Sequence, residues 1–192
     1  MLNNIKKCFD NYVKISSNSW EELKPILVKK EYKKNTIFCK ENQRYNNEIY
    51  IESGIIRNFY SSFTGDEINI NFYQENEFVS PWMYRNIEGR STLNIEALTD
   101  LLIYEFNALN FYELMRKYND LECFGRLFVE EQLREKTNRE IFILTKSAEE
   151  RFNYFTKKYP GLENKIAHYH IASYLGISPI SLSRLRNKRV KK

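Results

Sequence analysis

Residues 168–185 read HYHIASYLGISPISLSRL, and this stretch has the pattern of two short helices joined by a tight turn. Ile171 and Leu175 are four residues apart and therefore share one helical face. Gly176 stands where that helix has to stop, and glycine accepts the positive φ that such a stop often uses. Ser178 is a good N-cap and Pro179 a good first residue for a second helix. The stretch therefore predicts a helix-turn-helix.

In the second helix Leu182 and Leu185 are three residues apart and form the expected buried stripe. The residues left on its outward faces are Ile180, Ser181, Arg184, Asn187 and Lys188. A DNA-binding helix-turn-helix presents such a surface to the major groove. The alternative is a pair of amphipathic helices joined through glycine, as found in many α-helical domains that bind no DNA.

The charge distribution favours a polyanion as the partner. Residues 147–192 carry ten Lys and Arg against three Glu and no Asp, a net charge of +7, whereas residues 1–146 have a net charge of −2. Six of the last nine residues are basic: Arg184, Arg186, Lys188, Arg189, Lys191 and Lys192. Neutralising phosphates with such side chains releases counterions and supplies affinity for nucleic acid. A solvated basic tail is the alternative.

The remaining composition describes a soluble chain of one large domain or two small ones. It has 192 residues, 42% of them hydrophobic, and a mean hydropathy of −0.61. No signal peptide or membrane-spanning run is visible. The cysteines Cys8, Cys39 and Cys123 are widely separated, so we expect reduced thiols in a cytoplasmic protein.

The pattern of apolar residues divides the chain into three parts. Residues 17–30 predict a helix, and from about residue 33 to residue 106 short period-two runs predict strands of an antiparallel barrel or sandwich. Within them, residues 64–66 predict a hairpin turn. Residues 108–118 then predict a short helix and residues 120–145 a long one. The long helix is expected either to pair with a second copy or to lie on its own barrel.

A further helix is expected after the long one. Ser147 and Glu150 have capping-box spacing, and the helix should run to about Lys158. We place a domain boundary near residues 145–147.

The order of the expected elements is an N-terminal helix, a β-roll, a long helix and a C-terminal helix-turn-helix, and over essentially the whole chain it resembles the Crp/Fnr family of catabolite-activator-like transcription regulators. The most specific match is SAEERFNYFTKKYPGL (residues 147–162) followed by HIASYLGISPISLSRLR (170–186), which is similar to the subgroup common in Bacteroidetes. In the N-terminal half, IESGIIRNFY (51–60) and NEFVSPWMY (76–84) resemble segments of the family's cyclic-nucleotide-binding roll.

The resemblance implies an α+β fold in three parts. Residues 1–119 would form a cyclic-nucleotide-binding-like β-roll, a double-stranded antiparallel jelly roll that acts as a sensor. Residues 120–146 would be a long dimerisation helix, and residues 147–192 a helix-turn-helix domain whose wing is reduced or absent. The expected function is a homodimeric, sequence-specific transcription regulator that binds a palindromic operator through residues 178–189.

Residue by residue, the resemblance assigns base contacts to the start of the second helix. Pro179, Ile180, Ser181 and Arg184 occupy those positions, with Ser178 before them and Asn187 and Lys188 after them. Arg184 suits guanine. Ile180 stands where the family typically has glutamate, and it suits a thymine methyl instead. His168 and Tyr169 match positions that contact the DNA backbone.

The candidate effector pocket departs from the family pattern. Ser80, Pro81 and Trp82 replace the usual Gly-Glu-Leu turn, which removes the glycine and the ribose-binding carboxylate. Arg90, Ser91 and Thr92 stand near the phosphate-binding pair, with the arginine one position out of register. Trp82 and Tyr84 are interpreted as core or pocket-lining aromatics. We therefore expect the protein not to respond to cAMP.

The expected partners are double-stranded DNA and a second copy of the chain, with an unidentified small-molecule effector and RNA polymerase as further candidates; no membrane, metal or cofactor is expected. An enzyme is disfavoured because the only two histidines, His168 and His170, lie in the helical C-terminus and no common catalytic motif occurs. The alternative is a sensor or interaction module whose C-terminus docks protein.

Overall fold

The computed structural model describes residues 2–190, so Lys191 and Lys192 of the basic tail lie outside the described residues. The helices are α1 (Leu2–Tyr12), α2 (Ser17–Leu23), α3 (Ala108–Lys117), α4 (Asn119–Thr145), α5 (Ala148–Lys158), α6 (His168–Leu175) and α7 (Pro179–Val190). Three short 3-10 helices are η1 (Lys24–Ile26), η2 (Pro81–Tyr84) and η3 (Leu162–Asn164). The strands are β1 (Val28–Tyr32), β2 (Ile37–Cys39), β3 (Asn47–Ser53), β4 (Ile56–Ser61), β5 (Glu67–Tyr73), β6 (Phe78–Val79), β7 (Asn94–Ala97) and β8 (Leu101–Asn107).

The strands form a roll of two antiparallel four-stranded sheets, with strand orders β1-β8-β3-β6 and β2-β7-β4-β5. Apolar side chains fill the space between the sheets, namely Ile49, Ile51, Ile56, Ile95, Ala97 and Ile103. Gly54 joins β3 to β4 with φ +108°, and a Cβ there would lie 2.7 Å from the carbonyl oxygen of Asp100. The chain can pass this point only with glycine. The predicted antiparallel roll is confirmed.

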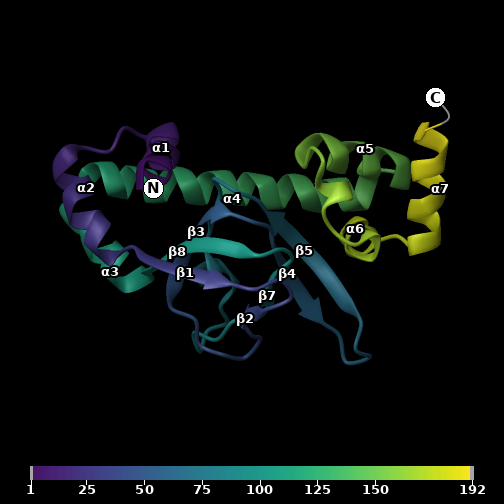
Figure 1. Cartoon of the computed structure of the whole chain (residues 1–192), viewed down its shortest axis with the longest axis horizontal. Coiled ribbons are helices and arrows are strands. Elements are labelled where there is room, and N and C mark those ends of the chain that lie inside the picture. The colour runs from purple at the N-terminus through teal and green to yellow at the C-terminus, as the bar shows by residue number, and fades with distance from the viewer. Residues whose placement is uncertain (1, 191–192) are drawn as a thin grey trace.

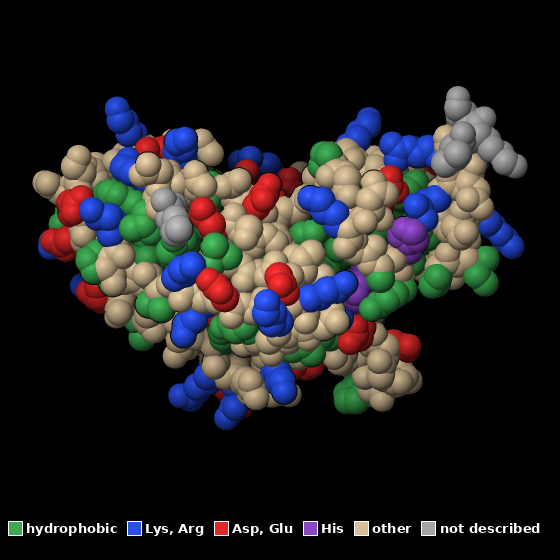
Figure 2. All heavy atoms as spheres, viewed as in Figure 1, with side chains coloured by type: hydrophobic (Ala, Val, Ile, Leu, Met, Phe, Trp, Pro, Cys, Tyr) green, Lys and Arg blue, Asp and Glu red, His purple; other side chains and the backbone are tan. Residues whose placement is uncertain are grey.

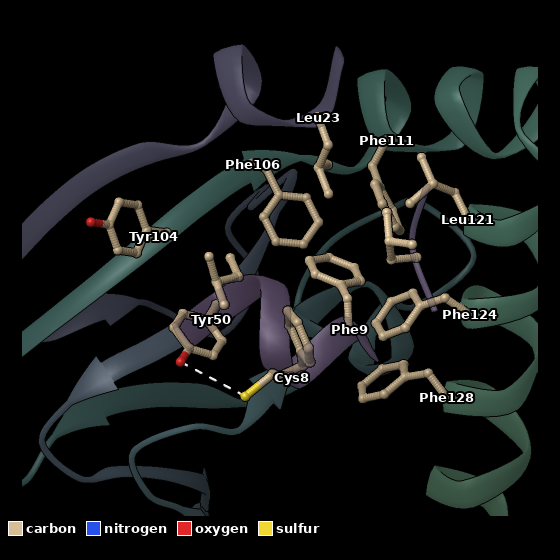
Figure 3. Packing of buried hydrophobic residues seen from close by; sticks show 13 residues of the cluster. Cys8, Phe9, Leu23, Tyr50, Tyr104, Phe106, Phe111, Leu121, Phe124 and Phe128 are labelled. Carbon is tan, nitrogen blue, oxygen red and sulfur yellow. Dashed lines mark hydrogen bonds between the residues drawn. The ribbon is translucent and has the colours of Figure 1, made fainter. Parts of the chain in front are cut away.

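An aromatic core joins the N-terminal helices to the roll and to the first half of α4 (Figure 3). Phe9 of α1 lies 4.3 Å from Phe124 of α4 and 4.7 Å from Phe78 of β6, measured between ring centroids. Phe128 stacks on Phe124 at 5.9 Å. Aromatic pairs of this kind add about 0.5–1.5 kcal/mol beyond their buried area. They fix the start of α4 against the roll.

The expected helix over residues 17–30 is wrong in its second half, and the first helix of the chain was missed. α2 ends at Leu23 because Pro25 cannot continue an α-helix, and Val28 already pairs with Glu105 in the sheet. α1 buries Ile5, Cys8 and Phe9.

The long helix α4 was predicted almost to the residue, and it runs across most of the molecule (Figure 1). The N-terminal helices gather at one end and α5–α7 at the other, with the roll alongside. Leu121, Phe124 and Phe128 are buried. On another face Val129 and Leu133 remain 51% and 64% exposed.

The C-terminal helices share a hydrophobic core with the roll. Phe72 of β5 lies 5.3 Å from Tyr174 of α6, and 6.1 Å and 6.0 Å from Phe155 and Tyr159, all between ring centroids. Ile55 of the roll belongs to the same cluster. The helices after residue 147 are therefore packed against the roll, and the boundary expected near residues 145–147 stays a prediction.

Polar contacts, which we call the α6–β5 seam, reinforce this packing. The amide of Asn69 donates to Oγ of Ser173 at 2.9 Å, and that hydroxyl donates to the carbonyl of Glu67 at 2.7 Å. The side-chain amide of Asn69 donates to the carbonyl of His170 at 3.1 Å. Arg139 of α4 donates to the carbonyl of Tyr174 at 3.2 Å. The seam thus joins β5, α4 and α6.

His170 is buried in the seam next to a cation. It is 4% exposed, and burial together with the charge of Arg57 lowers the pKa of its imidazole from 6.5 to about 4. The groups around Arg57 are Glu96, Glu67 and Asn69, which all bond to its guanidinium. His170 is therefore neutral in the folded protein at neutral pH.

This burial predicts a pH dependence of stability. Since the folded pKa of His170 lies below its unfolded pKa of 6.5, its stabilising effect is complete above that pH and is lost as the pH falls toward about 4. Between pH 7 and pH 5, His170 alone should lower the free energy of unfolding by about 2 kcal/mol. Urea unfolding of His170→Gln should lack this part of the pH slope.

The exposed His168 supplies the control, since His168→Gln should keep the part of the slope that comes from His170. Equal pH slopes for the wild type and His170→Gln would show that His170 protonates as easily in the folded chain as in the unfolded one.

Candidate functional site

The helix pair α6–α7 has the local geometry that its sequence predicts. Gly176 ends α6 with φ +63°, and the amide of Ile177 donates to the carbonyl of Ala172 at 3.0 Å. Oγ of Ser178 then accepts from the amide of Ser181 at 3.1 Å, so that Ser178 is the N-cap of α7. Pro179 is the first residue of that helix.

One side of the pair is buried against α5. Leu182 of α7 is fully buried, as are Ile171 and Ala172 of α6, and all three join a cluster with Phe152 and Phe155. The small side chain of Ala172 lets the second helix cross closely. This packing turns the opposite face of α7 outward.

The outward face of α7 presents an apolar side chain and a cation. Ile180 is 67% exposed, and Arg184 and Asn187 are also exposed. Within residues 2–190, no hydrogen bond or ion pair holds the Arg184 guanidinium. Ser183 is exposed beside them and was missed, because a serine directly after the buried Leu182 gives no pattern signal. This set forms the surface that we call the α7 outer face: Ile180, Ser183, Arg184 and Asn187.

Other predicted contact residues have partners inside the protein. Lys188 forms an ion pair with Glu149 of α5 at 2.8 Å, although its side chain remains exposed. Nδ1 of the exposed His168 lies 3.0 Å from the guanidinium of Arg186. Tyr169 is 57% exposed at the start of α6. Exposed ion pairs of this kind contribute little free energy.

Basic side chains gather around these helices. Figure 2 shows Lys and Arg side chains over α5 and α7 on the face in view, close to the histidines. On this face, basic side chains thus lie close to the pair α6–α7, which favours contact with a polyanion.

The residues of the expected effector pocket lie close together, but their side chains donate to backbone carbonyls of the protein. Oγ of Ser91 donates to the carbonyl of Leu93 at 2.6 Å, and the hydroxyl of Thr92 donates to the carbonyl of Tyr84 at 2.7 Å. The guanidinium of Arg90 donates to the carbonyl of Asn42 at 2.8 Å. The groups expected near a phosphate are therefore already engaged.

The aromatic residues of this region differ from the expectation in one case. Trp82, interpreted as a core or pocket-lining residue, is 45% exposed and lies 4.2 Å under the guanidinium of Arg85. The side chain of Trp82 faces solvent because Pro81 starts a 3-10 helix there and is itself the buried residue of that turn. Tyr84 does point inward, and its hydroxyl lies 2.7 Å from that of Tyr73.

A large cavity lies elsewhere, and the sequence did not reveal it. It has a volume of about 790 Å³, is partly open to solvent, and is lined by residues of α1, the region of β5 and β6, α4 and α5. None of Ser80, Pro81, Trp82, Tyr84 or residues 90–92 lines it. The polar middle of α4 borders this cavity through Glu131, Gln132 and Glu135, which explains why the apolar pattern of the helix is interrupted there.

Two further observations limit the chemistry. Within residues 2–190 there is no cluster of three or more His, Cys, Asp or Glu that could hold a metal ion. Cys8 and Cys39 are buried free thiols, and burial raises the pKa of each.

Comparison with known proteins identifies the class of fold. Residues 29–118 match the family of cyclic nucleotide-binding domains. The whole chain has the fold of Crp/Fnr-type transcription regulators. No curated protein matches the sequence significantly.

Three solved structures illustrate the likeness. A regulator from Eubacterium rectale assigned to the Crp/Fnr family has a TM-score of 0.73 and 20% identity, over 96% of this chain and 88% of that one. FixK2 from Bradyrhizobium japonicum has a TM-score of 0.72 and 15% identity, over 85% of this chain and 84% of that one. The catabolite activator protein of Thermus thermophilus has a TM-score of 0.58 and 15% identity, over 94% of this chain and 86% of that one.

The geometry around residues 80–92 predicts that cAMP does not bind. Calorimetric titration of the full chain with cAMP should give no heat of binding at micromolar concentrations, because the turn lacks a ribose-binding carboxylate and Ser91 and Thr92 already donate to carbonyls. Stoichiometric binding with a micromolar dissociation constant would contradict this prediction.

Proposed function

We propose that the protein is a sequence-specific DNA-binding transcription regulator of the Crp/Fnr type, that α6–α7 is its helix-turn-helix, and that α7 is the recognition helix. The observation that carries the proposal is the α7 outer face, where Arg184 is exposed and has no partner inside the described part of the chain. A recognition helix needs such free side chains because base edges are read by direct hydrogen bonds and apolar contacts. Placement in the subgroup common in Bacteroidetes stays a prediction.

The roles of the individual residues follow from their positions. Arg184 would donate to guanine, Ile180 would contact a thymine methyl, and Ser181 and Asn187 would lie beside them. His168, Tyr169, Ser178 and Lys188 would contact the DNA backbone. The two ends of the operator would be read by two copies of the chain.

We further propose that a second copy pairs along α4. Val129 and Leu133 leave an apolar face exposed on this helix, and Leu144 extends it at 77% exposure. Pairing the same face of two copies about a two-fold axis buries it symmetrically. The dimer would present two α7 helices to a palindromic site.

The proposed function is tested by random-site selection with the purified full chain. Enrichment of a palindrome is the expected result, since it requires both base reading and a dimer. An unenriched pool even at low salt would favour the alternative, in which the C-terminal helices dock protein. Salt separates the two further, because affinity for DNA falls steeply with salt and affinity of an apolar docking surface does not.

The substitution Arg184→Ala should weaken binding to the selected site by about 1–3 kcal/mol and relax the preference at one base pair. The loss follows from removing a bidentate contact to guanine. Fluorescence anisotropy with the selected site and with each single-base variant of it measures both effects. Arg116→Ala, an exposed arginine of α3 at the other end of the molecule, is the control and should change neither.

If Arg184→Ala instead weakens binding to every sequence equally, Arg184 is a phosphate contact and the assignment to a base is wrong.

The substitution Leu133→Asp should break the proposed dimer, because it places a charge in the buried centre of the α4 face. Sedimentation of the wild type at micromolar concentration should give about twice the chain mass of 23.2 kDa, and of the variant the chain mass. Leu109→Asp on α3 is the control, since Leu109 is similarly exposed at 56% but lies off α4. A monomeric wild type, with and without DNA, would exclude the dimer.

No helix among the described residues is long and apolar enough to cross a membrane.

A further inference from the structure

The cavity of about 790 Å³ lies where four elements meet. α1 supplies Tyr12, the region of β5 and β6 supplies Tyr73 and Phe78, α4 supplies Phe128, and α5 supplies Tyr154. Much of the wall is therefore aromatic. Aromatic faces attract cations and pack well against apolar bodies.

Charged side chains line the same cavity, and carboxylates outnumber amines. Glu77 comes from the turn between β5 and β6, and Glu131 and Glu135 come from successive turns of α4. The two amines are Lys157 and Lys158 of α5.

Most of these charges already have partners. Lys158 donates to Glu135, and the hydroxyl of Tyr12 donates to Glu131. Lys157 is solvent-exposed at the edge of the cavity. Glu77 accepts only from the backbone amide of Gln74, at 2.9 Å, and no Lys or Arg among residues 2–190 forms an ion pair with it.

Glu77 is thus a carboxylate without an ion pair of its own, and the nearby Lys158 is bonded to Glu135 instead. Burial raises the pKa of its carboxyl. The amide of Gln74 and the charge of Lys158 oppose this shift, whereas the negative charges of Glu131 and Glu135 add to it, and the pKa stays raised. A cation in the cavity would relieve this repulsion. An anion would instead have to lie against three carboxylates, with one of the two lysines already bound to Glu135.

We propose that this cavity binds an organic cation, a primary amine or polyamine with an apolar body, whose ammonium group lies between Glu77 and Glu131. Its body would pack on the aromatic wall formed by Tyr12, Phe78 and Phe128. The site is separate from residues 80–92 of the roll, none of which lines it.

Such a ligand would contact elements that also hold the pair α6–α7 in place. Asn71 and Phe72 of β5 line the cavity, and Asn69 on the same strand makes the α6–β5 seam. The cavity also touches α4 and α5. A ligand that prefers one arrangement of β5 and α5 would therefore shift the position of α6–α7, and through it the affinity for DNA. This regulatory role, unlike the binding itself, rests on the proposed function.

Calorimetry of the full chain at pH 7, without DNA, tests the site with defined probes. We would titrate tyramine, spermidine and the matched anion 4-hydroxyphenylacetate. At least one of the two cations should bind with one-to-one stoichiometry, and the anion should not bind.

Two substitutions in the cavity should change the affinity for the cation in opposite directions. Glu77→Gln should weaken the binding of the cation about tenfold or more, as expected for losing a charged hydrogen-bond acceptor. Lys157→Glu changes an exposed side chain at the edge and should strengthen binding. Glu75→Gln is the matched control, because Glu75 is an exposed carboxylate of the same turn that does not line the cavity.

Failure of both cations to bind the wild type would overturn the proposal, as would tighter binding of the anion or unchanged binding by Glu77→Gln in a folded variant. If Glu77→Gln does not fold, Lys157→Glu decides. Cation binding by this variant that is weaker than, or equal to, that of the wild type overturns the proposal. DNA affinity measured without any amine tests the proposed function separately. If the chain binds the amine but not DNA, the proposed amine site is supported and only the proposed function is contradicted.

Discussion

The guanidinium of Arg57 is 3% exposed, and three side chains of its own sheet hold it in place. Nε donates to Glu96 at 2.5 Å, and the terminal nitrogens donate to Glu67 at 2.5 Å and to Asn69 at 3.0 Å. Glu67 and Asn69 are also the residues whose backbone and side-chain groups meet α6. Removing one partner of a buried charge typically costs about 3–5 kcal/mol. Arg57 therefore holds the side chains of Glu67 and Asn69 on β5 in position. Because these two residues also bond to α6, the docking of α6–α7 depends on this buried cation.

The parts of the fold that could be predicted from sequence are those set by neighbouring residues. Gly176 and Ser178 specify the turn between α6 and α7 through a positive φ and an N-cap, and both act within a few residues. The capping box of Ser147 and Glu150 is equally local. Residues 17–30 show the limit, because Val28 pairs with Glu105, which is far away in the chain.

The candidate site divides in the same way. Exposure of Ile180 and Arg184 follows from helical periodicity, since Leu182 and Leu185 define the buried side. Periodicity does not reveal the partner of a charge, so the ion pair of Lys188 with Glu149 and the bond of Arg90 to Asn42 could not be foreseen. The cavity was hidden for the same reason: Glu77 and Glu131 come together only through the fold.

The length of α4 has a mechanical consequence. Phe128 sits in the aromatic core at one end of the molecule, and Arg139 reaches the carbonyl of Tyr174 at the other. Eleven residues separate them, about three full helical turns, so both side chains leave the helix in nearly the same direction. Described residues 119–145 contain no proline, and nothing interrupts the rod between these two points. A small rotation of the helix about its axis, produced by repacking of the phenylalanines, would turn Arg139 by the same angle, so α4 mechanically couples the aromatic core to the α6–β5 seam.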